Sequence, residues 1–251
     1  MKHFLLSLAL ALLPLFGHAM RPAEEHINLL FIGNSITAGA TLTNRSAEAP
    51  PIVCGELVQQ ATGRPTNVYN GGHSGITTYG FLPGTKDFTG VVNAAKAFQR
   101  SNGGKLYFSI MLGTNDSSYS PGNSASKGGP ATPEVYKENM KQIIDSLIAQ
   151  FPDCKILVNY PIWYSPNTYN GARYLQEGLD RLRTFYPVID ALVAAYDQVY
   201  AGDRGAWEAF ENHPELFTSE NGHAGIFHLH PNAQGARRLA ELWAKRLLLI
   251  L

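Results

Sequence analysis

The sequence predicts an α/β fold in which a parallel sheet is covered by helices on both faces. Short apolar runs typical of buried strands alternate along the chain with longer stretches whose apolar residues recur at helical spacing. This alternation favours a parallel sheet, because each parallel pair of strands needs a crossover connection. Polar side chains directly follow three of the apolar runs, and the carboxyl ends of parallel strands lie at one edge of a sheet. We therefore expect these polar clusters to converge.

Four strands and five helices account for most of the pattern. The strands are expected at 27–32, 66–70, 106–112 and 155–159. The helices are expected at 52–62, at 91–100, after the N-cap Thr132, at 174–185 and at 233–249. Two segments are expected as loops: 38–51, where two consecutive prolines oppose a helix, and 117–131, which is rich in Ser, Gly, Pro and Asn. Residues 188–227 are irregular, and a fifth strand fits there.

Residues 1–19 have the pattern of a signal peptide. A short polar start precedes an apolar run, and small residues at Gly17 and Ala19 suit cleavage before Met20. The run is shorter than a typical membrane-spanning helix, and an uncleaved anchor is the alternative. We expect an exported protein, periplasmic or extracellular, with no stable membrane insertion after cleavage. Residues 20–251 then form one domain, since no low-complexity linker divides them.

The charge balance excludes some classes of partner. Lysine and arginine together number 20, as do aspartate and glutamate. The chain therefore offers no net field that would select nucleic acid or an acidic membrane, and we expect neither as a partner. Cys54 and Cys154 are compatible with one disulfide in an oxidising compartment and equally with two buried thiols. The sequence leaves this pairing open, as it does the oligomeric state.

Ser35 is the candidate nucleophile. It ends the tight Gly33-Asn34-Ser35 turn after the first predicted strand, where ligands bind in open α/β sheets. Acyl transfer through a serine also needs a base within hydrogen-bond reach and donors for the developing oxyanion. His230, just before the last helix, is the candidate base. The backbone N–H groups of Ser35 and Gly72 and the side-chain amide of Asn115 are the candidate donors.

Four separated blocks of the sequence resemble the SGNH (GDSL-like) hydrolase superfamily. They are Gly33-Asn34-Ser35, Asn70-x-Gly72, Gly113-Thr114-Asn115-Asp116 and His230-Pro231-Asn232. The blocks occur in the family's order and span almost the whole chain after residue 19. The resemblance implies a three-layer α/β/α sandwich with a flavodoxin-like five-stranded parallel sheet. It also implies that Ser35 is the nucleophile and His230 the general base, and that Gly72 and Asn115 complete the oxyanion hole with the Ser35 amide.

Two positions depart from the family's pattern. Asn34 replaces the aspartate of the name motif, and Phe227 replaces the aspartate that usually lies three residues before the histidine and orients it. A phenylalanine accepts no hydrogen bond from the imidazole N–H, so another carboxylate, a backbone carbonyl or a water must do so. Four upstream glutamates are candidate acids: Glu208, Glu211, Glu215 and Glu220.

Each candidate residue also has a purely structural interpretation. Ser35 is compatible with a helix cap alone, and Gly72 with a need for positive φ alone. Ser74, on a glycine-rich turn, is a rival nucleophile. Asn115 is compatible with a turn-shaping role, which for Asp116 is the preferred interpretation.

Two side-chain clusters leave alternatives open. His228 and His230 alternate on one face of an expected extended segment and lie close in sequence to His213 and His223. This spacing fits a zinc site only loosely, and we expect no metal. The second cluster is aromatic and forms either a platform beside the site or the packing of a long loop. It consists of Tyr160, Trp163, Tyr164 and Tyr169.

The sequence thus predicts an exported serine esterase of the SGNH type that needs no cofactor. Exported members that resemble this chain often remove acetyl groups from polysaccharides or sialic acids, so a carbohydrate O-acetyl ester ranks first among small-molecule or glycan substrates. Hydrolysis of lipid or aryl esters, as by lysophospholipases, thioesterases and arylesterases, is the enzymatic alternative. A catalytically silent glycan-binding member of the fold is the alternative from another class.

Overall fold

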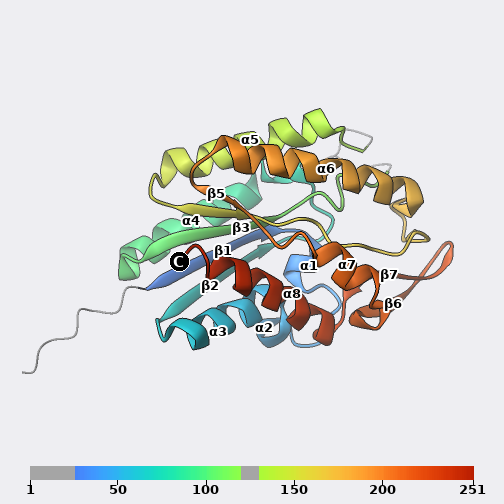
Figure 1. The fold of residues 1–251 in the computed structure, drawn as a ribbon, viewed down its shortest axis with the longest axis horizontal. Coiled ribbons are helices and arrows are strands. Elements are labelled where there is room, and N and C mark those ends of the chain that lie inside the picture. The colour runs from blue at the N-terminus through green and yellow to red at the C-terminus, as the bar shows by residue number, and fades with distance from the viewer. Residues whose placement is uncertain (1–25, 120–129) are drawn as a thin grey trace, which may run out of the picture.

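A computed structural model describes residues 26–119 and 130–251, so the predicted signal peptide and most of the loop predicted at 117–131 lie outside the described residues. Five parallel strands form a sheet in the order β2-β1-β3-β4-β5 (Figure 1). They are β1 (Ile27–Gly33), β2 (Thr66–Gly72), β3 (Lys105–Met111), β4 (Lys155–Val158) and β5 (Val199–Ala201). This is the flavodoxin-like order, with its switch point between β1 and β3. The predicted fold is confirmed, and the fifth strand lies within 188–227.

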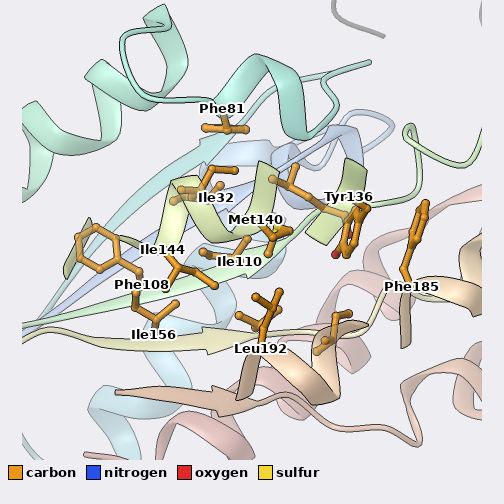
Figure 2. Packing of buried hydrophobic residues seen from close by; sticks show 14 of the residues in the cluster. Ile32, Phe81, Phe108, Ile110, Tyr136, Met140, Ile144, Ile156, Phe185 and Leu192 are labelled. Atoms are coloured by element: carbon orange, nitrogen blue, oxygen red, sulfur yellow. The ribbon is translucent and has the colours of Figure 1, made fainter. Parts of the chain in front are cut away.

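Helices cover both faces of the sheet. α4 (Lys86–Asn102), α5 (Pro133–Gln150) and α6 (Leu175–Ala195) lie on one face, and α3 (Pro50–Thr62) and α8 (Ala233–Leu247) on the other (Figure 1). Alternate side chains of β1 serve the two cores, since Ile32 packs under α4 and α5 whereas Phe31 packs against Trp243 of α8. Figure 2 shows the first core, with Met140 and Ile144 of α5 over the sheet. Within the described ranges, no helix has the length and apolar character needed to cross a bilayer.

Several helix boundaries differ from the prediction. α3 begins at Pro50, because a proline in the first turn lacks only an N–H that has no helical partner there. α4 begins at Lys86, where Thr85 is the N-cap, and α6 continues through the exposed Pro187. The loop predicted at 38–51 is wrong in part. It includes a second short helix, α2 (Arg45–Glu48), and begins at the last residue of α1 (Ser35–Ala38).

A two-stranded hairpin stands outside the main sheet and leads into α8 (Figure 1). Its antiparallel strands are β6 (Phe217–Gly222) and β7 (Gly225–Pro231), and short elements precede it: α7 (Ala206–Glu211) and the 3₁₀ turn η3 (Pro214–Leu216). Phe217 pairs with Pro231 and Ser219 with His228, so β7 has one residue more than β6 over this stretch. The extra residue is a β-bulge, a feature that redirects side chains.

The two cysteines are free thiols. Cys54 lies in the core under α3 and α8, whereas Cys154 lies in the core on the opposite face of the sheet. Burial raises the pKa of both thiols, that of Cys154 to about 12. The structure therefore favours two buried thiols over the disulfide.

Candidate active site

Ser35 and His230 come together at the carboxyl edge of the sheet. Ser35 is the first residue of α1, directly after β1, and His230 lies near the end of β7. The distance from Ser35 Oγ to His230 Nε2 is 2.8 Å. Ser35 is 8% exposed and the side chain of His230 is 12% exposed, so the pair is shielded yet reachable. A hydroxyl held against an imidazole nitrogen is the arrangement that nucleophilic catalysis requires.

Asn34, rather than Ser35, caps the helix that follows β1. The side-chain oxygen of Asn34 accepts a hydrogen bond from the N–H of Ile36 at 2.9 Å. The interpretation of Ser35 as a helix cap alone is therefore wrong. The N–H of Ser35 lies in the first turn of α1, where N–H groups have no carbonyl partner within the helix. The turn thus presents a hydroxyl and an amide hydrogen from the same residue.

Glu220 supplies the carboxylate that Phe227 cannot. Both oxygens of Glu220 lie 2.9 Å from His230 Nδ1, and Oε1 also accepts a hydrogen bond from the backbone N–H of His230 at 3.2 Å. Glu220 pairs directly across the hairpin with Phe227, whose ring is buried in the core. Glu211 instead accepts a hydrogen bond from the indole N–H of Trp207, and Glu215 pairs with His213 on the surface. The carboxylate that contacts His230 therefore comes from β6, the strand paired with β7.

The β-bulge sets the direction of His230. Ser219 and Glu220 are consecutive in β6, so their side chains point to opposite faces of the hairpin. The imidazole of His228 lies 3.4 Å from Ser219 Oγ, whereas that of His230 bonds to Glu220. The expectation that His228 and His230 share one face is therefore wrong, because the bulge between them reverses the alternation of side chains.

The remaining histidines of the loose zinc pattern are dispersed. His213 pairs with Glu215 at 2.7 Å, and the ring of His223 packs on that of Tyr169 with centroids 4.6 Å apart. Across residues 26–119 and 130–251, no group of three or more His, Cys, Asp or Glu side chains is arranged to hold a metal ion.

Gly72 packs against α1, the short helix that begins with Ser35. A Cβ at this position would stand 2.3 Å from Ala38 N and 2.8 Å from the carbonyl carbon of Thr37. Gly72 does not have a positive φ, so the close approach to α1, and not a left-handed backbone, requires glycine. The Gly72 N–H is donated to Asn70 Oδ1 at 3.0 Å. The end of β2 is thereby held beside the segment that carries Ser35.

Ser74 lacks the geometry of an activated nucleophile. It is exposed on the turn after β2. The neighbouring His73 pairs with Asp87 of α4 at 2.8 Å and is itself exposed. An activated serine needs a base held against its hydroxyl, and Ser35 meets this requirement.

Asn115 lies at the carboxyl end of β3, on the other side of the switch point from Ser35. It is nearly buried, and both ends of its amide are bonded. Nδ2 donates to the carbonyl of Ile76 at 2.7 Å, and Oδ1 accepts from the hydroxyl of Tyr174 at 2.6 Å. Because an amide nitrogen carries two hydrogens, one N–H is left for another acceptor.

Asp116 does more than shape a turn, contrary to the preferred interpretation. It is buried and accepts hydrogen bonds from the N–H of Thr78 at 3.0 Å and from the Thr78 hydroxyl at 2.5 Å. Asn139 of α5 donates in turn to Thr78 Oγ1 at 2.9 Å. Burial raises the Asp116 pKa to about 6. Asn115 and Asp116 together fix the loop that follows Gly72 through its residues Ile76 and Thr78.

The aromatic loop divides between core and surface. Tyr160 and Tyr164 are buried, and their hydroxyls bond to Asp190 and Ser117. For these two tyrosines the packing interpretation holds. Trp163 is half-buried and packs edge-on against Phe217 of β6.

Three solved structures illustrate the likeness of the fold. Est24, a carbohydrate acetylesterase from Sinorhizobium meliloti, is 17% identical with a TM-score of 0.59, covering 89% of this chain and 99% of that one. A carbohydrate esterase of family 3 from Talaromyces cellulolyticus is 17% identical, with a TM-score of 0.57 and coverage of 89% and 97%. The aryl esterase of M. smegmatis is 16% identical, with a TM-score of 0.57 and coverage of 89% and 99%.

A comparison with curated proteins finds no match. The sequence pattern of the GDSL-like lipase/acylhydrolase family, however, matches residues 31–238. The matched range contains Ser35 and His230 as well as the loops after β2 and β3. Because this match covers most of its length, the chain belongs to the GDSL-like lipase/acylhydrolase family. The predicted fold and the serine held against a histidine agree with this, and the chain is a carboxylic ester hydrolase.

Proposed function

We propose that the protein is a serine esterase that hydrolyses short-chain esters, foremost O-acetyl groups on carbohydrate, through Ser35, His230 and Glu220. The observation that carries the proposal is the chain of contacts from Ser35 Oγ to His230 Nε2 at 2.8 Å and from His230 Nδ1 to Glu220 at 2.9 Å. Glu220 accepts the Nδ1 hydrogen, which leaves the lone pair of Nε2 facing the serine hydroxyl.

The reaction proceeds in two steps. Ser35 Oγ attacks the ester carbonyl carbon while His230 Nε2 takes the hydroxyl proton, and the carbonyl π electrons move to oxygen. The tetrahedral intermediate collapses with loss of the alcohol, which receives the proton from His230. Water then attacks the acyl-enzyme with His230 again as base, and the carboxylic acid product and free Ser35 are released.

Three donors serve the oxyanion in this proposal. The Ser35 N–H lies in the first turn of α1, and Asn115 has one amide hydrogen beyond the one given to Ile76. The Gly72 N–H is the third, and it is shared with Asn70 Oδ1. Donors aimed at a developing oxyanion in a water-poor site are typically worth about 10²- to 10³-fold in kcat each.

Glu220 favours turnover over the glycan-binding alternative. That alternative depends on the absence of an aspartate at position 227, and Glu220 fills the same hydrogen-bonding role. Carbohydrate acetyl esters stand first because two structural neighbours that share the fold bear the names carbohydrate acetylesterase and carbohydrate esterase. Aryl and lipid esters are the second substrate class, given the family's lipases and the aryl esterase of the same fold.

Export is also part of the proposal. Residues 1–19 act as a signal peptide, and residues 20–251 are the mature single domain. Amino-terminal sequencing of the protein secreted by its own host tests this: we expect the chain to begin at Met20, and an intact Met1 would contradict it.

The activity is tested with p-nitrophenyl acetate and an O-acetylated oligosaccharide. Ser35→Ala should lower kcat at least about 10⁴-fold on both, whereas the matched control Ser74→Ala should keep it. Hydrolysis that survives in Ser35→Ala would refute the proposed nucleophile. Ser35-dependent hydrolysis of the aryl acetate without release of acetate from the oligosaccharide would place the substrate in the second class.

A further inference from the structure

The amide of Asn115 is fixed at both ends. Its Oδ1 accepts from the Tyr174 hydroxyl at 2.6 Å and its Nδ2 donates to the carbonyl of Ile76 at 2.7 Å. A flipped amide would set Oδ1 against the Ile76 carbonyl, with two acceptors and no hydrogen between them. The two contacts together determine which end of the amide is nitrogen and where its second hydrogen points.

Tyr174 is well placed to act as a permanent donor. Its side chain is buried, and its ring packs edge-on against Tyr164 with centroids 5.4 Å apart. Burial raises the Tyr174 pKa to about 12, so the hydroxyl keeps its hydrogen across the working range of an esterase. The donor and its acceptor are 59 residues apart in the sequence, so only the tertiary fold brings them together.

The backbone at Tyr174 is strongly constrained. The next residue, Leu175, has a φ of 52°, a left-handed backbone conformation that residues other than glycine rarely adopt. The N–H groups of Tyr174 and Leu175 both donate to the carbonyl of Thr168 at 3.2 Å. Such a conformation persists only where surrounding contacts over-determine it, and such strain clusters at functional sites. Here it fixes the start of α6, from which Tyr174 reaches Asn115.

We propose that Tyr174 is a positioning residue for ester hydrolysis, whose hydroxyl holds the Asn115 amide so that its remaining N–H points at the oxyanion. This inference rests on the proposed function, because the oxyanion role of Asn115 belongs to it. Tyr174 itself touches no reacting atom. Removing its hydroxyl leaves Asn115 Oδ1 without this donor, and the amide is then held only by its contact with the Ile76 carbonyl. The oxyanion therefore faces a less firmly held partner, while substrate binding is preserved.

The test is a double-mutant cycle in p-nitrophenyl acetate hydrolysis, with wild type and Ser35→Ala in the same assay. Tyr174→Phe should lower kcat about 10- to 100-fold with little change in KM, since loosening an oxyanion donor costs less than the 10²- to 10³-fold of removing one. Asn115→Ala should show the larger loss. If Tyr174 acts through Asn115, Tyr174→Phe should change kcat by less than about threefold in the Asn115→Ala background, because coupled residues are not additive.

Tyr164→Phe is the matched control. It also removes one buried tyrosine hydroxyl, which lies 3.2 Å from Ser117 Oγ. It should keep the wild-type kcat even if its melting temperature falls as far as that of Tyr174→Phe. Two results would overturn the inference and leave the proposed function intact. One is a wild-type kcat in Tyr174→Phe. The other is that Tyr174→Phe lowers kcat by the same factor in the wild-type and in the Asn115→Ala background. Wild-type hydrolysis that does not depend on Ser35 would overturn both.

Discussion

Glu220→Gln should disable the enzyme with little effect on its fold. The substitution keeps the size of the side chain and removes its negative charge. Glutamine can donate to His230 Nδ1 as readily as accept from it, so the imidazole loses its preference for the tautomer with a bare Nε2. The imidazolium that forms during the attack also loses its counter-charge. Both effects slow the chemical step, so kcat should fall while KM changes little.

The geometry gives the magnitude of this loss. Both carboxylate oxygens contact Nδ1 at 2.9 Å, and Glu220 and His230 are only 20% and 12% exposed. Two unit charges about 4 Å apart at an effective dielectric constant of about 20 attract by about 4 kcal/mol, which corresponds to about 10³-fold in rate. The loss of tautomer preference adds to this, and replacing the acid of a serine-protease triad by its amide costs about 10⁴-fold. We expect a fall in kcat of about 10³- to 10⁴-fold.

The assay is steady-state hydrolysis of p-nitrophenyl acetate, with circular dichroism and thermal melting as checks on folding. Glu215→Gln is the matched control, because Glu215 precedes the same hairpin and pairs with exposed His213 on the surface. The control should keep wild-type kcat. If Glu220→Gln folds and retains kcat within about tenfold of wild type, Glu220 is not the acid of the site and the account of His230 is wrong.

Three further results are expected. Burial raises the Asp116 pKa to about 6, so the folded protein holds this proton more tightly than the unfolded chain. The free energy of unfolding of the wild type, compared with that of Asp116→Asn, should therefore fall as the pH rises from about 4 to above 6. The expected fall is up to about 3 kcal/mol. Denaturation curves across this range measure the difference, and parallel pH profiles would refute it. Cys54 and Cys154 should resist a thiol reagent in the native protein and both react once it is unfolded; a disulfide-linked peptide would contradict this. EDTA should leave hydrolysis unchanged, whereas a loss restored by zinc would favour the metal alternative.

The parts of the site that the sequence predicts well are those encoded by contiguous residues. The run from Ile27 through Ser35 specifies a buried strand, a turn and a polar residue at its end, so the position of the candidate nucleophile follows from local pattern, and its candidacy rests also on the other three blocks. His230 follows in the same way from its position just before α8. These segments needed no tertiary information beyond the rule that ligands bind at the carboxyl ends of parallel strands.

The acid could not be chosen from the sequence because its position depends on strand register. Glu220 meets His230 only when β6 and β7 pair with a bulge, and residue spacing does not reveal a bulge. One signal was available: Gly222 and Gly225 flank a two-residue turn, which would suggest a hairpin with Glu220 opposite Phe227.

The roles of Asp116 and Tyr174 are likewise non-local. Asp116 bonds to a residue 38 positions away, and Tyr174 to one 59 positions away. The sequence predicts a turn residue at Asp116 and the start of a helix at Tyr174, and both predictions are compatible with the additional contacts of these residues. Contacts of this kind become visible only once the loops after β2, β3 and β4 are placed together.

The most direct test of the central claim is covalent labelling with a fluorophosphonate, which reacts with serines that a base has activated. The protein is labelled, digested and analysed by peptide mass spectrometry, with His230→Ala treated in parallel. The account predicts one labelled serine, Ser35, and loss of the label in His230→Ala. A label on Ser74 or another serine, or labelling of Ser35 that persists without His230, would contradict it.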